Sequence, residues 1–131
     1  MRRVMGSPEA RGQAAVELAL VLPILLLVGL ALVQVGLLAR DRLVLEQASR
    51  AGAREAAVTP DEEAVRRAVV AAAPGLDLGA IELEVARAGS AGDPVTVSLR
   101  YADPVRVPFV GWLFPPAVEL SASATARQEF A

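Results

Sequence analysis

Few residues in this sequence have the types and spacing that catalysis needs. The chain has no His and no Cys, so it lacks the commonest general base, the commonest metal ligand and any thiolate. Ser98, Ser121 and Ser123 lie in alternating, strand-like patterns without a base or a pair of acids beside them. We therefore expect no enzymatic activity, no cofactor, no metal site and no small-molecule substrate.

Two acidic features remain to be explained. Glu17 is the only charged residue between Gly12 and Ala39. A plain membrane anchor does not need such a carboxylate, although its cost at the end of a span is smaller than at the centre. The second feature is the run of three acids at 61–63. On the first turn of a helix, such a run is typical of pairing with the helix dipole, and we do not expect it to bind a metal.

The uncharged run from Leu18 to Ala39 predicts a transmembrane helix. As a helix it would be ~33 Å long, enough to cross the hydrocarbon core of a bilayer. The helical pattern continues past Arg40, which argues against a cleaved secretory signal. Three arginines precede the run, at positions 2, 3 and 11. They favour a cytoplasmic N-terminus and an extracytoplasmic C-terminal domain in a single-pass protein of the cell membrane.

The helix is expected to begin near Gly12 and to continue to about Val58, with Pro23 inside it. Gln34 either bonds to another helix or lies near the lipid headgroups. Past the membrane, small side chains share one narrow face, and this pattern favours packing onto the chain's own domain over contact with another subunit. The residues of this stripe are Leu45, Ala48, Gly52 and Ala56.

The rest of the chain predicts an α+β domain. Thr59 and Pro60 begin a second helix, which ends at Pro74 and Gly75. Alternating apolar residues then predict an antiparallel sheet of three to four strands. These strands lie at 81–86, 95–101 and 118–126, with a short proline-flanked stretch at Val105 and Val107.

The predicted organisation has three parts. A basic cytoplasmic leader occupies 1–12, a long helix occupies 13–58 with its transmembrane part at 18–39, and an extracytoplasmic domain occupies 59–131. The net charge of −2 argues against a nucleic-acid partner.

An aromatic loop, PFVGWLFPP, separates the last two predicted strands. It contains Phe109, Trp112 and Phe114, three of the five aromatic residues in the chain. Such a loop is either an interaction patch or membrane-surface contact, or a local core that covers the open end of the sheet. The sequence favours neither.

The N-terminal half of the chain resembles the TadE-like family, pseudopilins of the tight-adherence (Flp, type IVc) pilus system. The resemblance rests on the Arg–Gly pair at 11–12, AAVE at 14–17, VLP at 21–23 and ASRAGAREAAV at 48–58. It covers about the first half of the chain closely and the strands only loosely.

The resemblance implies a minor pilin or pseudopilin that takes part in pilus assembly and cell adhesion. A prepilin peptidase would cut after Gly12 and leave Gln13 as the new N-terminus, whose amine could meet the Glu17 carboxylate of a neighbouring subunit. The implied partners are the membrane, the peptidase, other pilins and the pilus platform proteins, and the protein would lie in the membrane or the pilus. The alternative is a membrane-anchored binding module whose aromatic loop captures a partner.

Overall fold

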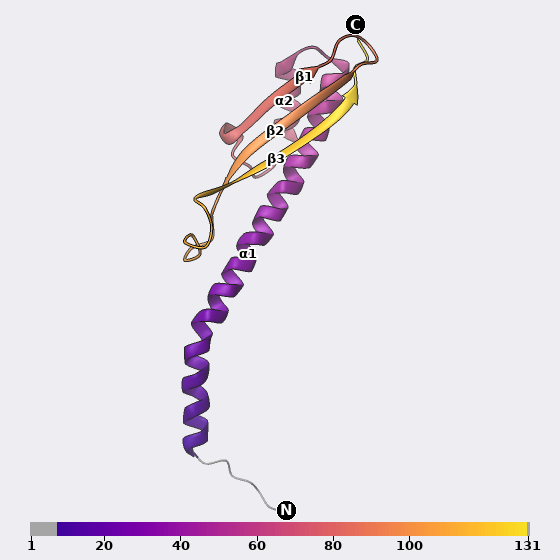
Figure 1. The fold of residues 1–131 in the computed structure, drawn as a ribbon. Helices are drawn as coiled ribbons and strands as arrows, with labels where there is room; N and C mark the ends of the chain where they lie inside the picture. Colours follow the sequence, from indigo (N-terminus) through magenta and orange to yellow (C-terminus); the bar gives the residue numbers. More distant parts are fainter. Residues whose placement is uncertain (1–7, 131) are drawn as a thin grey trace, which may run out of the picture.

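The structure, a computed structural model, describes residues 8–130 (Figure 1). One long helix, α1 (Pro8–Val58, 51 residues), carries a small head of one further helix and a sheet on its C-terminal half. The residues before Pro8, which include Arg2 and Arg3 of the predicted basic leader, lie outside the described part of the chain.

Helix α1 begins earlier than the sequence predicts, at Pro8 instead of near Gly12. Proline is favoured in the first turn of a helix, because its missing N–H would have no partner there. Pro23, by contrast, lies inside the helix and cannot donate to the carbonyl of Ala19. The helix changes direction in its indigo N-terminal third, the part that contains Pro23 (Figure 1).

The second helix, α2 (Glu62–Ala71), is capped by Asp61 and not, as predicted, by Thr59. The Asp61 carboxylate accepts a hydrogen bond from the Glu63 N–H at 3.0 Å, while the Thr59 hydroxyl accepts from the Asp61 N–H at 3.2 Å. The first residue of the acidic run, Asp61, thus caps the N-terminus of α2.

The sheet has three antiparallel strands in the order β1-β2-β3. They are β1 (Ile81–Arg87), β2 (Pro94–Pro104) and β3 (Ala117–Arg127), and a short 3-10 turn, η1 (Leu78–Ala80), precedes them. This arrangement confirms the predicted α+β fold. The stretch at Val105 and Val107 is a loop, because the flanking prolines lack N–H groups and the N–H groups of Arg106 and Val107 bind a side chain of α1.

The core lies between the C-terminal half of α1, α2 and one face of the sheet. Leu45, Ala48 and Ala56 of the predicted stripe are fully buried within the head, so the stripe packs intramolecularly, the alternative that the sequence favours. At Gly52 an added Cβ would lie 2.7 Å from Val69 Cγ2. Small side chains on this face therefore let α1 approach the other core elements closely.

We expect the head to fold without the apolar half of α1. A fragment that starts at Asp41 keeps every core residue, because the first of them along the chain is Leu45. It should be soluble, show both helix and sheet signals in circular dichroism, and unfold cooperatively on heating. A fragment without a cooperative transition would mean that the head depends on the membrane helix or on partners.

Candidate functional site

The predicted processing and docking residues lie together near the start of α1. Gly12, Gln13 and Glu17 are all exposed, and the bond between Gly12 and Gln13 lies within the helix. A Cβ added at Gly12 would meet nothing within 4 Å, so the fold itself gives no reason for a glycine there. The Glu17 carboxylate emerges between two apolar neighbours, Val16 and Leu18, which are themselves 62% and 61% exposed.

The apolar part of α1 is uncovered. Large side chains from Val16 to Val35 are exposed along the helix, far more than the surface of a water-soluble protein normally shows. Within residues 8–130, one helix is long and apolar enough to cross a membrane, and none of its most apolar window is buried. This helix is therefore a candidate membrane anchor.

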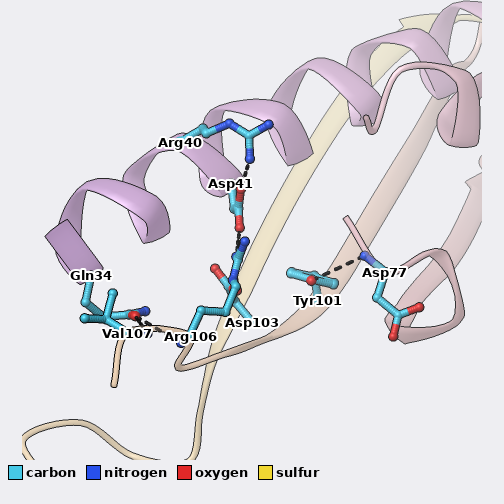
Figure 2. A network of polar contacts seen from close by, with 8 residues as sticks. All are labelled: Gln34, Arg40, Asp41, Asp77, Tyr101, Asp103, Arg106 and Val107. Carbon is cyan, nitrogen blue, oxygen red and sulfur yellow. Dashed lines mark hydrogen bonds and ion pairs between the residues drawn. The ribbon is translucent and has the colours of Figure 1, made fainter. Parts of the chain in front are cut away.

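A second cluster lies where the head meets the apolar part of α1 (Figure 2). We call it the polar clamp, and its members are Gln34 and Asp41 of α1, Asp103 of β2 and Arg106 of the loop that follows β2. The Gln34 side chain is fully buried. Its Oε1 accepts hydrogen bonds from the backbone N–H groups of Arg106 and Val107, both at 3.1 Å. Gln34 thus fixes the loop to the helix.

Two buried carboxylates of the polar clamp share one guanidinium group. Arg106 Nη2 donates to Asp103 Oδ1 at 2.6 Å and also pairs with Asp41 Oδ2. Asp41 Oδ1 accepts a further bond from Arg40 at 3.0 Å. Burial raises the pKa of Asp103, and the nearby Arg106 offsets part of that shift. The hydrogen bonds that Arg106 donates to the carboxylates of Asp41 and Asp103 raise the pKa of Arg106, so it stays charged at any physiological pH.

Asp41, Asp103 and Arg106 are not among the residues that the sequence singles out, and Gln34 bonds to a loop of its own chain instead of another helix. The signals were present in the periodicity. Asp103 continues the inward-facing alternation of β2 that runs through Leu99 and Tyr101. Gln34 and Asp41 extend the buried stripe of α1 towards the membrane at the same helical spacing.

Tyr101 lies beside the polar clamp, and its hydroxyl accepts a 3.4 Å hydrogen bond from the Asp77 N–H (Figure 2).

The aromatic loop extends past the end of the sheet and lies alongside α1 (Figure 1). Phe109 and Trp112 are 78% and 75% exposed, so they do not form a local core over the sheet, while Phe114 is partly buried. Trp112 and Leu113 line an open groove of about 350 Å³ together with apolar α1 residues from Ile24 to Val35. The structure therefore brings the loop to the middle of α1 and not to the site at Gly12 and Glu17.

Comparison with known proteins gives one family. The family model described as TadE-like protein matches residues 12–54, which confirms the resemblance seen in the sequence. No curated protein and no solved structure is significantly similar to the chain. The match begins at Gly12 and ends before α2, so it lies entirely on α1. From Gly12 to Arg54 the long helix of this chain, which carries the N-terminal candidate site, is thus similar to TadE-like protein.

Proposed function

We propose that this chain is a minor pilin or pseudopilin that takes part in assembly of a tight-adherence (type IVc) pilus. The observation that carries the proposal is the TadE-like match, which starts at Gly12 and covers an exposed apolar helix. The N-terminus lies in the cytoplasm, residues 18–39 cross the cell membrane, and residues 59–131 form the extracytoplasmic domain. A single-pass subunit of this kind has its head available to other pilus components outside the cytoplasm.

Processing is the first step of the proposed mechanism. A prepilin peptidase on the cytoplasmic side cuts after Gly12 and frees the amine of Gln13. The open space around Gly12 supports this step. Because the fold does not require a glycine there, recognition by the peptidase is a reason for it. Cleavage of a bond within α1 needs the first turn to unwind. A glycine lowers that cost, since it destabilises a helix by roughly 0.5–1 kcal/mol relative to alanine.

Docking is the second step. The new amine of one subunit pairs with the Glu17 carboxylate of its neighbour as the apolar helices come together. At ~4 Å the pair gains ~4 kcal/mol of Coulomb energy at an effective dielectric of 20, and desolvation offsets much of that. The ion pair therefore sets the register between subunits, while packing of the exposed apolar side chains of α1 supplies most of the cohesion.

The Gly12→Val variant tests processing. We expect it to accumulate as the uncut precursor, because a branched side chain does not enter a cleft shaped for glycine. Gly36→Val is the matched control, since Gly36 is also an exposed α1 glycine with nothing within 4 Å of an added Cβ. A blot of host membranes should show precursor for Gly12→Val and mature protein for Gly36→Val. Normal processing of both variants would contradict the assigned cut site.

The exposure of Phe109 and Trp112 favours a second candidate, a membrane-anchored binding module. In that case the loop captures an envelope partner and α1 serves only as an anchor. The two functions differ at the N-terminus, because an anchor keeps Met1 to Gly12 and a pseudopilin loses them.

A further inference from the structure

We infer that the loop from Val107 to Pro116 enters the outer leaflet of the membrane beside α1. The protein then contacts lipid through two elements, a spanning helix and an interfacial loop. The inference needs α1 to be a membrane helix, but it holds whether or not the chain is processed or assembled into a pilus.

The position of the loop gives the first argument. Trp112 and Leu113 lie against the stretch of α1 from Ile24 to Val35, which is part of the predicted membrane span. A segment beside these residues lies at the same depth as they do. The groove between loop and helix is lined by apolar side chains alone, and it is continuous with the exposed apolar surface of α1. The medium that covers that surface, lipid, is therefore the occupant that the groove fits.

The composition of the loop gives the second argument. No charged residue occurs from Val107 to Val118, and Phe109, Trp112 and Leu113 are 78%, 75% and 47% exposed. A loop in water is normally polar, whereas tryptophan is enriched where a membrane meets water. Phe109 has φ 66, a left-handed conformation that bulky residues rarely adopt. The chain thus maintains an unfavourable backbone conformation at Phe109, a residue whose ring is exposed.

Backbone and indole hydrogen bonds give the third argument, because donors without partners are costly in lipid. The Trp112 indole N–H donates to the Phe109 carbonyl at 3.0 Å, and the Leu113 N–H donates to the Val110 carbonyl at 2.9 Å. The Val107 N–H is bound by Gln34. Prolines occupy positions 108, 115 and 116 and have no N–H to satisfy. The backbone N–H groups at positions 109–112 and 114 have no such partner within the described residues 8–130. They need water or headgroup oxygens, so the loop lies at the headgroup level of the outer leaflet and not deep among the acyl chains.

The polar clamp places the membrane surface. Its charged members are Asp41, Asp103 and Arg106, and the uncharged loop begins directly after Arg106. The headgroups therefore lie at the clamp, and the acyl chains begin below it. On this account the span along α1 runs from about Gly12 to Gln34, ~35 Å as a helix. That span is shifted towards the N-terminus from 18–39 and puts Glu17 about 8 Å inside its cytoplasmic end.

The test uses Trp112, the only tryptophan in the chain. The full chain is reconstituted in phosphatidylcholine–phosphatidylglycerol vesicles, with lipids brominated at shallow or deep acyl positions. The control carries Trp112→Phe and Val58→Trp, because Val58 is an exposed residue at the far end of α1. We expect blue-shifted Trp112 emission, severalfold stronger quenching by shallow bromines than in the control, and weaker quenching by aqueous iodide.

Dilution of the protein in lipid separates the two ways of covering the loop. If lipid covers it, the blue shift and the bromine quenching persist at high lipid-to-protein ratios. A blue shift that disappears on dilution, without bromine quenching, would show that a second copy covers the groove and would overturn the inference. Emission from Trp112 that matches the water-exposed control would overturn it as well.

Discussion

Glu17→Ala should be inserted and cleaved normally yet should fail to assemble. Insertion should not suffer, because removal of a charge makes the apolar run more hydrophobic. Cleavage should persist, since Gly12 and the residues before it are unchanged. The variant lacks the one carboxylate between Gly12 and Ala39, so the N-terminal amine of a neighbouring subunit is left unpaired among packed apolar helices, which is costly. We expect few or no pili per cell and loss of co-purification with other pilus components.

Matched variants separate the charge from other effects. Glu17→Asp keeps the charge but shortens its reach and should be intermediate, while Glu17→Gln keeps the shape and should resemble alanine. Glu46→Ala is the control on the same helix, because Glu46 forms only exposed ion pairs with Arg42 and Arg50, which contribute little. Its pili should be normal. Normal pili in Glu17→Ala, with processed protein on the blot, would leave Glu17 as a mere marker of the membrane edge.

Arg106→Met should destabilise the full chain by about 3 kcal/mol, the lower end of the range for breaking a buried ion pair. The lower end applies because the Arg106 side chain is itself 35% exposed, while Asp41 and Asp103 are fully buried. Without the guanidinium, Asp103 loses its cation and Asp41 keeps only Arg40. Arg100→Met, an exposed arginine on β2, is the control and should change stability little. Urea unfolding in detergent micelles, followed by circular dichroism, measures both.

Asp103 of the polar clamp also makes the stability of the chain depend on pH. Burial raises the pKa of Asp103 above its usual 3.8, so the folded chain holds that proton to higher pH than the unfolded chain does. The group therefore favours the folded state below pH 3.8, and this contribution is lost as the pH rises through the raised pKa. Asp103→Asn should remove this term, and its stability relative to wild type should increase as the pH rises above 3.8. The opposite trend would mean that Arg106 outweighs burial at Asp103.

The sequence predicts the fold well where one periodicity dominates. The uncharged run specifies the long helix α1, and the alternation of apolar residues in the three strand stretches specifies the antiparallel sheet. Boundaries are less well determined. The sequence predicts Thr59 as the cap of α2, but the cap is Asp61. Both residues are good caps and lie on either side of a proline, so the sequence does not decide between them.

The sites differ in how far sequence reasoning can reach. Gly12 and Glu17 are recognisable because they interrupt or flank an apolar run, although the roles proposed for them depend on partners outside the chain. The polar clamp is harder to predict, since Gln34 and Arg106 are far apart in sequence and meet only when β2 packs on α1. The position of the exposed Trp112 is as hard to predict, because the loop that carries it is bonded to Gln34 of α1 in the same packing.

The central claim is that this chain is a processed subunit, and its N-terminus tests that claim most directly. Intact-mass and N-terminal peptide mass spectrometry of the protein, extracted from the membranes of its own host, identifies the first residue. The account predicts a mature chain that begins at Gln13, with precursor accumulating only when Gly12 is replaced by valine. A mature chain that still begins at Met1 would contradict the pseudopilin function and leave a membrane-anchored module.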